Sequence, residues 1–347
     1  MTRVLVGSYS IPSEWTGTPY GHGAGITSAR LEGGSLVPEE GARWEVNPSF
    51  LVADPAAGLL WAITEPEHGG EVLAFAADGT GLPAGEPARF ATGRDAPCHL
   101  TVTPGLVLVS HYHGGAVSVI GRGPDGLPSA VLDIVEPPAA GEGWDRSAEP
   151  ARAHSTLWLG DGRFLVADCG RDTVLLYRWD AGRQATVLLD ALVLQPGTGP
   201  RHLARHPLSG RVLVSDQNLG AATVVAVEEA RLRHVQTLVT SGVGRARVVP
   251  SEIAVHPAGE LAVMANRVDD SLTVFRIVPD GRLAEAASVG AGGVNPRHFA
   301  FTPDGARLVV AHQESDELAV FAVADGRLIH ESSARVATPT CVAFWAA

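Results

Sequence analysis

The chain has 347 residues, of which 45% are hydrophobic and 18% are charged, and its formal net charge is −12. The net negative charge argues against nucleic acid or an anionic membrane as a partner. The chain also has 40 glycines and 24 prolines, and this many residues that interrupt helices argues against a helical protein. No apolar run reaches the roughly 18 residues that span a membrane, and the N-terminus lacks a signal-peptide core, so we expect a cytoplasmic protein.

Two further features of the composition limit the chemistry. All basic side chains other than histidine are arginine, so no lysine Schiff base is possible and anions have to be bound by Arg or His. The three cysteines, Cys98, Cys169 and Cys341, are few and widely spaced. This pattern argues against a disulfide framework and against a cysteine-based zinc site.

In chain order, the first predicted strands span residues 3–8 and 26–31, on either side of a Gly/Pro-rich loop. From Asn47 onward one unit repeats: a turn, a short strand, a second turn rich in Pro and Gly, and another apolar strand that ends in polar residues. The units start near positions 48, 97, 152, 200, 250 and 296, and a further copy begins at Pro339. Short strands that recur roughly every 40 to 50 residues are typical of β-propeller blades.

The two ends of the chain complete the repeat. Residues 340–345 look like the first strand of a unit with no continuation, and residues 3–46 look like the three remaining strands of a unit with no beginning. Pairing the C-terminal strand with the N-terminal blade closes the ring and removes exposed sheet edges. The sequence therefore predicts an all-β, seven-bladed β-propeller of four-stranded antiparallel blades, with residues 1–347 as a single domain.

The order of the strands separates two faces of the predicted propeller. The second strand of a unit returns antiparallel to the first, so residues before the first strand and residues after the second lie on one face, which we call the near face. The Pro-x-x-Gly turns lie on the opposite, far face. His206 and His256 precede prolines of these far turns, and we interpret them as turn and surface residues.

The predicted near face collects ionisable and amide side chains from every unit. Polar groups that converge at the mouth of a central channel are the usual hypothesis for a site, although residues at strand ends also cap backbone groups. The starts of first strands contribute His99, His154, Arg201, His202, Glu252, Arg297 and His298. The ends of second strands contribute Tyr9, Glu65, His111, His113, Asp168, Asp216, Gln217, Asn266, Arg267, His312 and Gln313.

Three familiar kinds of site lack support in the sequence. His111 and His113 are spaced as a zinc-binding pair on a strand, but they precede two glycines and have no defined carboxylate partner. No Gly-x-Ser-x-Gly stretch supports a Ser-His-Asp triad, and no glycine-rich loop precedes a helix to bind phosphate. We therefore predict no metal and no cofactor.

Six stretches carry a family resemblance, and they occur in order along the chain. They are Asn47-Pro-Ser-Phe-Leu, Pro97-Cys-His, Gly199-Pro-Arg-His, Pro250-Ser-Glu-Ile, Ala265-Asn-Arg and Asn295-Pro-Arg-His. The ordered set resembles the signature stretches of the lactonase-type seven-bladed propellers. That family includes the cycloisomerase-like 6-phosphogluconolactonases and the fungal carboxymuconate cyclases, and the resemblance covers essentially the whole chain.

The resemblance implies a metal-independent site with one histidine, two arginines and an acid. On this chain the histidine is His154 and the arginines are Arg201 and Arg267. The position of the acid carries Gln217, which cannot act as a general base, so Asp216 is the alternative carboxylate if the strand register shifts. The Arg-Ala-His sequence that ends at His154 also departs from the Pro-rich His pair of the family.

The implied activity is hydrolysis of a sugar-derived lactone that bears a phosphate or a carboxylate. Arg201 and Arg267 would bind the anionic group and the oxyanion, and His154 would be the general base, with Gln217 beside them. The further substrate-binding candidates are Glu65, His99, Asp168, His202, Asp216, Glu252, Arg297, His298 and His312.

Two alternatives stay open. In a cyclase or another specialised enzyme acting on a carboxylated lactone, the same histidine would move a proton at carbon while the arginines hold the substrate carboxylates. A propeller can also be a non-enzymatic binding scaffold, because this fold supports many unrelated functions.

Overall fold

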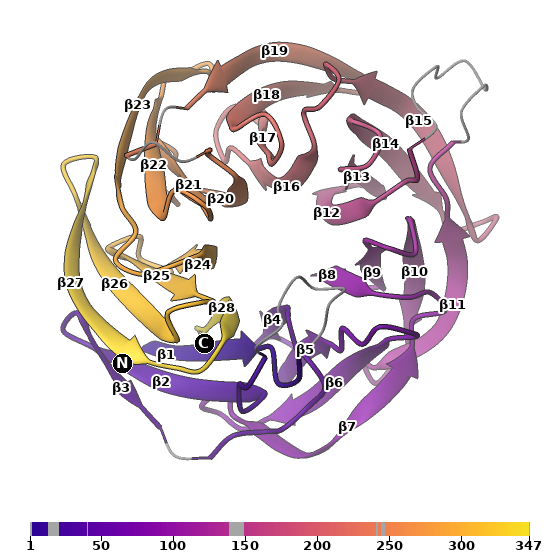
Figure 1. Cartoon of the computed structure of the whole chain (residues 1–347). Coiled ribbons are helices and arrows are strands. Elements are labelled where there is room, and N and C mark those ends of the chain that lie inside the picture. The colour runs from indigo at the N-terminus through magenta and orange to yellow at the C-terminus, as the bar shows by residue number, and fades with distance from the viewer. Residues whose placement is uncertain are drawn as a thin grey trace.

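The computed structural model describes residues 2–12, 21–39, 41–138, 149–240, 242–243 and 247–346. These residues form seven four-stranded antiparallel sheets. Figure 1 shows the sheets as blades around a central axis, with the first strand of each blade innermost. The predicted all-β, seven-bladed propeller is confirmed. In the described part of the chain, no helix is long and apolar enough to cross a membrane.

The strands of each blade follow here from the innermost to the outermost. Blade 1 comprises β4 (Leu51–Asp54), β5 (Leu59–Ile63), β6 (Glu71–Ala77) and β7 (Pro83–Ala91), and blade 2 comprises β8 (Pro97–Val102), β9 (Leu106–His111), β10 (Ala116–Arg122) and β11 (Pro128–Val135). Blade 3 comprises β12 (Ala153–Gly160), β13 (Arg163–Asp168), β14 (Thr173–Asp180) and β15 (Ala185–Val193), and blade 4 comprises β16 (Pro200–Arg205), β17 (Val212–Asp216), β18 (Ala221–Glu228) and β19 (Arg231–Val239). Blade 5 comprises β20 (Pro250–Val255), β21 (Leu261–Asn266), β22 (Ser271–Ile277) and β23 (Leu283–Gly290), and blade 6 comprises β24 (Pro296–Phe301), β25 (Arg307–His312), β26 (Glu317–Ala324) and β27 (Arg327–Arg335). Blade 7 combines both ends of the chain in β28 (Pro339–Trp345), β1 (Thr2–Ser8), β2 (Ile26–Glu32) and β3 (Ser35–Pro38).

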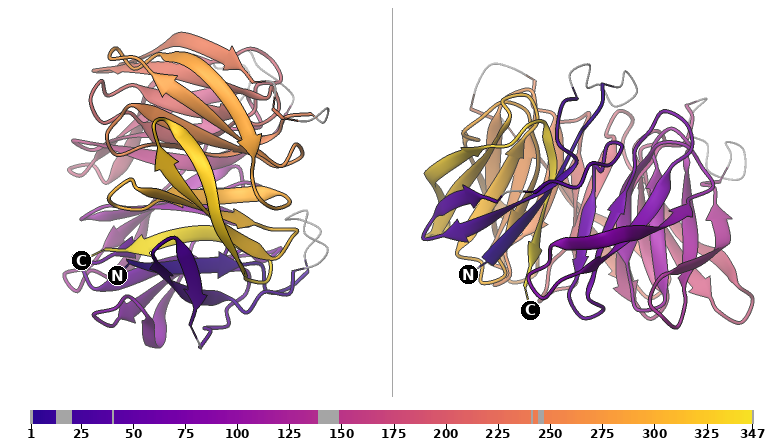
Figure 2. Two further views of the ribbon diagram at one scale, coloured as in Figure 1. Left: turned by 90° about the vertical axis from the view of Figure 1, so that its left-hand side faces the viewer. Right: turned by 90° about the horizontal axis from the view of Figure 1, so that it is seen from below.

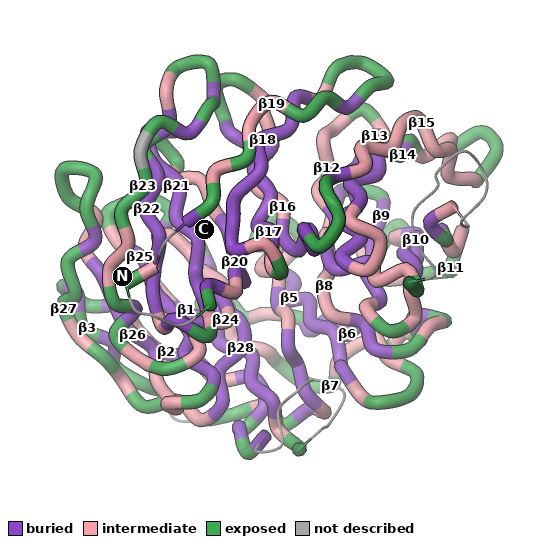
Figure 3. The backbone as a smooth tube through the Cα atoms, turned by 45° about the horizontal axis from the view of Figure 1, so that its top comes forward, coloured by how far each residue is buried: buried purple, intermediate pink, exposed green. Residues whose placement is uncertain are grey.

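Burial explains why the second strand of each unit reads as an apolar run. Every residue of β9, β17 and β21 is buried, because both faces of these strands pack against neighbouring blades. The outermost strands, such as β19, carry charged and polar residues on their exposed positions. Figure 3 shows this gradient as buried inner strands and exposed outer strands and turns. The hydrophobic core is therefore divided into layers between adjacent blades.

The ring closes where the sequence predicts. β28 pairs antiparallel with β1, in a register that runs from Arg3 opposite Trp345 to Gly7 opposite Cys341. The two termini consequently lie close together on one face of the molecule (Figure 2). This pairing supplies blade 7 with its innermost strand, so that it has four strands like the other blades.

The far-face histidines connect the turns of adjacent blades. His206 Nε2 lies 2.8 Å from the carbonyl oxygen of Gly259, and His256 Nε2 lies 3.0 Å from that of Gly305. Both glycines have positive φ, and a Cβ at Gly305 would lie 2.4 Å from His256 Nε2. Their placement at turns is confirmed, but the prediction of a surface position is wrong for His206, which is buried between two blades.

We expect Leu5→Ala to lower the free energy of unfolding by about 2–5 kcal/mol. Leu5 is fully buried on β1 and packs in one cluster with Leu60, Phe75 and Cys341, at the junction between the closing blade and blade 1. Urea denaturation of the whole chain measures the loss. The control is Leu208→Ala, whose side chain is 78% exposed, and equal effects of the two substitutions would contradict the packing described for the junction.

Candidate active site

One position recurs at the near face of every blade, directly after the second strand in six blades and two residues after it in blade 1. At this position the backbone amide donates to the carbonyl of a residue just before the first strand, at 2.8 to 3.1 Å, as in Gln217 to Gly199 and Tyr112 to Ala96. The seven residues are Tyr9, Glu65, Tyr112, Cys169, Gln217, Arg267 and Gln313, and we call them the mouth ring. Because the same backbone hydrogen bond anchors each one, they lie at one level around the channel.

The first strands carry the next two levels of side chains. In blades 2 to 6 the pairing of the first and second strands shifts register at the second or third residue of the first strand, as between Pro97 and His99. Such irregularities change the direction in which side chains point, so that the side chains of two consecutive residues can both reach the channel. Arg201 and His202 are one such pair in blade 4.

The third residue of the first strand in blades 2, 4, 5, 6 and 7, together with Phe50 just before β4 in blade 1, supplies the deepest of these levels. The centroid of the Phe50 ring lies 4.3 Å from that of His99 and 5.4 Å from that of His298, and His99 lies 5.4 Å from His202. Since these rings come from blades 1, 2, 4 and 6, they close the channel from several sides at this depth. We call the set formed by Phe50, His99, His202, Glu252, His298 and Cys341 the channel floor.

Two arginines above the floor, the buried Arg201 and the partly buried Arg267, keep unused donors. Arg201 Nε and Nη1 have no hydrogen-bond partner among the described residues, and neither has Arg267 Nε. Arg267 Nη2 donates to Gln217 Oε1 at 2.6 Å. Burial, and then the charge of Arg297, lower the pKa of Arg201 to about 10, and burial and Arg201 lower the pKa of Arg267 to about 9. Concentrated positive charge with free donors favours an anionic ligand at this place.

A third arginine is already paired on the opposite side of the mouth ring. Arg297 Nη2 donates to Tyr9 Oη, and its guanidinium carbon lies 4.9 Å from the centroid of the Tyr9 ring. Tyr9 Oη in turn donates to Glu65 Oε2 at 3.1 Å. Burial raises the pKa of Glu65, and the charge of Arg297 opposes that rise. This cluster satisfies its own polar groups, so the free cationic donors are those of blades 4 and 5.

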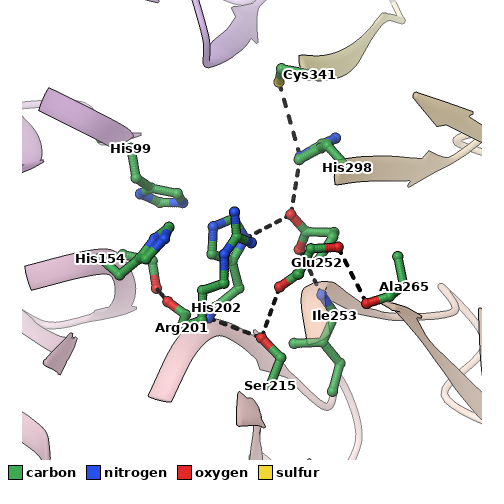
Figure 4. Close-up of polar contacts among 12 residues, drawn as sticks. His99, His154, Arg201, His202, Ser215, Glu252, Ile253, Ala265, His298 and Cys341 are labelled. Atoms are coloured by element: carbon green, nitrogen blue, oxygen red, sulfur yellow. Dashed lines mark hydrogen bonds and ion pairs between the residues drawn. The ribbon is translucent and has the colours of Figure 1, made fainter. Parts of the chain in front are cut away.

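Glu252 connects two histidines of the channel floor. Its Oε2 lies 2.7 Å from His202 Nδ1 and 3.1 Å from His298 Nε2, and its Oε1 accepts the Ile253 amide at 3.0 Å. Figure 4 shows Glu252 between the two rings, with His99 and His154 on the other side of His202. Burial raises the pKa of Glu252, whereas burial and the neighbouring charge of Arg201 hold the pKa of His202 well below its usual value.

His154 lies one level above the floor, next to His202 and Tyr112. The centroid of its ring is 5.2 Å from that of His202 and 5.3 Å from that of Tyr112. Its Nδ1 is buried and has no hydrogen-bond partner in the described part of the chain. Burial, and then Arg201, hold its pKa well below the usual range, so the imidazole is neutral at pH 7.

The structure brings together most of the predicted site residues. Around the mouth ring and the channel floor lie His154, Arg201, Arg267, Gln217, Glu65, His99, His202, Glu252, Arg297 and His298. Asp168, Asp216 and His312 do not join them. These three are the last residues of second strands and are fully buried.

The side chains of Asp168 and Asp216 serve their own blades rather than the channel. Asp216 Oδ2 accepts from Thr223 Oγ1 on the third strand of its blade at 2.7 Å, and Asp168 Oδ1 accepts the amide of Arg152 at 2.8 Å. Side chains alternate along a strand, so the last strand residue points outward when the next residue faces the channel. The prediction of these residues as substrate contacts is therefore one position out of register, and Asp216 does not replace the acid at Gln217.

His312 also belongs to the interior of its blade. It pairs with Pro296 and with Glu317 across the sheet, and its ring lies where a Cβ on Gly293 would come within 2.6 Å. Burial lowers its pKa to about 4. Its prediction as a substrate-binding residue has the same one-residue error as that of the two aspartates.

Because of the same one-residue error, the sequence-based prediction did not include two members of the mouth ring, Tyr112 and Cys169. Each directly follows a residue predicted for the near face, His111 or Asp168. Its spacing from the carbonyl that it bonds differs from the spacing in blades 1, 4, 5 and 6, so no sequence signal identifies it. The alternative zinc pair also separates: His111 is buried with Nε2 3.0 Å from Ser118 Oγ, whereas His113 is exposed. No group of three or more His, Cys, Asp or Glu side chains among the described residues is arranged to hold a metal ion.

Comparisons with known proteins agree with the fold. The family model "Lactonase, 7-bladed beta-propeller" matches residues 3–344. A 6-phosphogluconolactonase of Bacillus subtilis is 27% identical over 246 residues, which cover 67% of this chain and 67% of that protein. An uncharacterized protein of Lactococcus lactis is 29% identical over 249 residues, which cover 69% of this chain and 70% of that protein.

Solved structures share the fold over almost the whole chain. A putative 6-phosphogluconolactonase from Bacteroides fragilis has a TM-score of 0.86 at 24% identity and covers 99% of this chain and 98% of its own. A periplasmic gluconolactonase of Pseudomonas aeruginosa has a TM-score of 0.85 at 24% identity, with 99% of each chain covered.

We expect Gln217→Glu to weaken the binding of inorganic phosphate by on the order of 10-fold, because a carboxylate 2.6 Å from Arg267 Nη2 would neutralise one of the two free cations. Isothermal titration calorimetry with phosphate measures the effect. Gln184→Glu is the matched control, since it adds the same charge at an exposed turn between β14 and β15. Equal or tighter phosphate binding by Gln217→Glu would show that Arg267 does not face the anion.

Proposed function

We propose, because this chain belongs to the lactonase family of seven-bladed β-propellers, that it hydrolyses a lactone bearing a phosphate or carboxylate group. The observation that carries the proposal is the pair of arginines at the channel mouth, the buried Arg201 and the partly buried Arg267, each of which keeps at least one guanidinium donor without a partner among the described residues. A buried, unpaired guanidinium is costly to maintain unless an anion binds it. The pair therefore supports an anionic substrate more than a neutral one.

The same arrangement suits the chemistry of lactone opening. Attack of water on the lactone carbonyl places negative charge on the carbonyl oxygen, and a guanidinium fork can stabilise that oxyanion while its neighbour binds the anionic substituent. A neutral imidazole is needed to take the proton from the water, and the channel holds several imidazoles whose pKa is lowered by burial, His154 and His202 among them. The donors left free are cationic, which favours a metal-independent site.

The relatives point to one substrate to try first. Proteins named 6-phosphogluconolactonase in Bacillus subtilis and, as a probable activity, in Arthroderma benhamiae match this chain at 27% identity each. A phosphate on the substrate would be a suitable partner for the free donors of Arg201 and Arg267.

Gln217 supports a second candidate, a cyclase that closes or opens the ring of a carboxylated lactone. The amide leaves Arg267 without a carboxylate beside it, so this arginine is free to hold a substrate carboxylate. The two functions would use the same site for different reactions: hydrolysis adds water and breaks the acyl C–O bond, whereas the cyclase moves a proton at carbon and consumes no water. A substrate panel separates them.

The panel consists of 6-phosphogluconolactone, uncharged aldonolactones and muconolactones, each followed for ring opening and for ring closure. We expect the purified chain to open the anionic lactones faster than the uncharged ones and to keep its rate after incubation with EDTA. Ring closure as the faster direction would favour the cyclase. No activity on any lactone, in either direction, would reject both candidates and leave the binding scaffold.

We expect Arg201→Ala to lower kcat/KM on the anionic lactone by on the order of 10²-fold, because it removes both anion and oxyanion contacts. The loss on an uncharged lactone should be smaller, since only the oxyanion contact is then removed. Steady-state kinetics on the two substrates measure the difference. The control is Arg211→Ala, which removes an arginine that donates a hydrogen bond to the backbone carbonyl of Asp280 at a far-face turn. Wild-type kinetics of the Arg201→Ala enzyme would contradict the role assigned to Arg201.

A further inference from the structure

Three histidines occupy the same position in different blades, but they do not carry their proton on the same nitrogen. His99, His202 and His298 are each the third residue of a first strand, in blades 2, 4 and 6. His298 Nδ1 accepts the amide of Val342 at 3.2 Å, and His99 Nδ1 accepts the amide of Thr156 at 3.5 Å. A nitrogen that accepts from a backbone amide has no proton, so the neutral forms of these two rings carry the proton on Nε2.

His202 has the opposite arrangement. Its Nδ1 lies 2.7 Å from Glu252 Oε2, and a carboxylate oxygen accepts, so in the neutral ring the proton is on Nδ1. The lone pair of His202 is therefore on Nε2, for which no described residue is a hydrogen-bond partner. Of the three equivalent rings, His202 is the one whose outer nitrogen can accept a proton.

Glu252 is held in place from three sides, which fixes the orientation of His202. It accepts His202 Nδ1–H, His298 Nε2–H and the amide of Ile253. The His298 ring is itself anchored by Val342 of β28, the strand that closes the propeller. A histidine whose inner nitrogen donates to a buried carboxylate, with its outer nitrogen free, has the geometry of a general base that is oriented by an acid.

Further charged and titratable groups surround His202. They are His99 on β8, His154 on β12, Arg201 on β16, Glu252 on β20, and Arg297 and His298 on β24. The two arginines oppose a positive charge on the ring, and Glu252 is the one carboxylate bonded to it in the described part of the chain. The neutral ring is thus favoured before the reaction, and Glu252 stabilises the cation that forms during it.

We propose that His202 is the general base of this site and that Glu252 is the residue that positions it, an inference that rests on the proposed lactone hydrolysis. His202 Nε2 takes a proton from the attacking water while the water oxygen bonds to the lactone carbonyl carbon and the carbonyl electron pair moves to oxygen. When that pair returns, the ring C–O bond breaks, and the imidazolium returns its proton to the leaving alkoxide. The role differs from the sequence-based assignment of His154 as the base.

The first test is chemical rescue. We expect His202→Ala to lower kcat by on the order of 10²-fold or more and to regain part of the activity when free imidazole is added, because imidazole can replace a missing base. A structural role predicts no such rescue. His154→Ala is assayed alongside, and the inference is overturned if His154→Ala shows the larger loss and the rescue, or if His202→Ala keeps its activity.

The second test concerns Glu252. Removing its negative charge destabilises the imidazolium, so Glu252→Gln should lower the pKa of His202 and move the acidic limb of the kcat/KM profile to lower pH, by about one unit or more. It should also lower kcat with less effect on KM, because the orientation of the base is lost rather than the binding of substrate. An unchanged acidic limb, or a limb that moves to higher pH, contradicts the proposal.

The third test needs no substrate and separates this inference from the proposed function. Nuclear magnetic resonance of the whole chain with 15N-labelled histidine reports which ring nitrogen is protonated, and His202→Gln assigns the signal. We expect His202 at pH 7 to be protonated on Nδ1 alone, and His298 on Nε2 alone. A His202 protonated on Nε2 overturns the inference even if the enzyme opens lactones. A wild-type chain with the expected tautomer but no lactonase activity overturns the proposed function instead.

Discussion

One backbone hydrogen bond, repeated around the ring, determines where the chemistry of this propeller can lie. In each blade a residue one or two positions after the second strand donates its amide to a carbonyl that precedes the first strand. This contact ties the outgoing and incoming segments together at the near face, so that Tyr9, Glu65, Tyr112, Cys169, Gln217, Arg267 and Gln313 form one level. With the backbone fixed in this way, each blade can vary one side chain at the mouth without changing the fold. The blades differ in chemistry although they share a frame.

The charged side chains at the channel mouth are distributed unevenly between the blades, and this distribution defines the site. On one side, Arg297, Tyr9 and Glu65 satisfy one another. On the other, the buried Arg201 and the partly buried Arg267 keep unused donors, and the side chain that Arg267 contacts at the ring is the amide of Gln217. An amide accepts a hydrogen bond but brings no negative charge, so the cationic character of this side is not neutralised by the protein. An anionic ligand would supply the negative charge that the protein does not provide on this side of the channel.

The channel floor shows how context assigns different roles to identical residues. His99, His202 and His298 occupy equivalent places, yet two of them are bonded at Nδ1 by a backbone amide of the next blade and one by the carboxylate of Glu252. The partner at Nδ1 decides the tautomer, and the tautomer decides whether Nε2 donates or accepts. The partner of His298 comes from the C-terminal strand, so ring closure also contributes to the order of the floor.

The architecture and most of the residues at the channel mouth could be predicted from the sequence. The spacing of the repeats predicted the blades, the incomplete units at the two ends predicted the closure of β28 onto β1, and the polar starts of the first strands predicted Arg201, His202, Glu252 and His298 at the near face. These features depend on the spacing of the repeats and on the order of the strands, and both can be recognised in the sequence alone.

Which of two consecutive residues faces the channel could not be predicted, because it depends on how the strands pair in three dimensions. Asp216 and Gln217 are adjacent in sequence, but one bonds Thr223 within the blade and the other bonds Arg267 at the mouth. The direction of a side chain changes with every residue of a strand and with every bulge, so an error of one position reverses it. The pairing of His202 with Glu252 likewise joins strands of neighbouring blades, 50 residues apart, and no local pattern specifies the hydrogen bond that sets its tautomer.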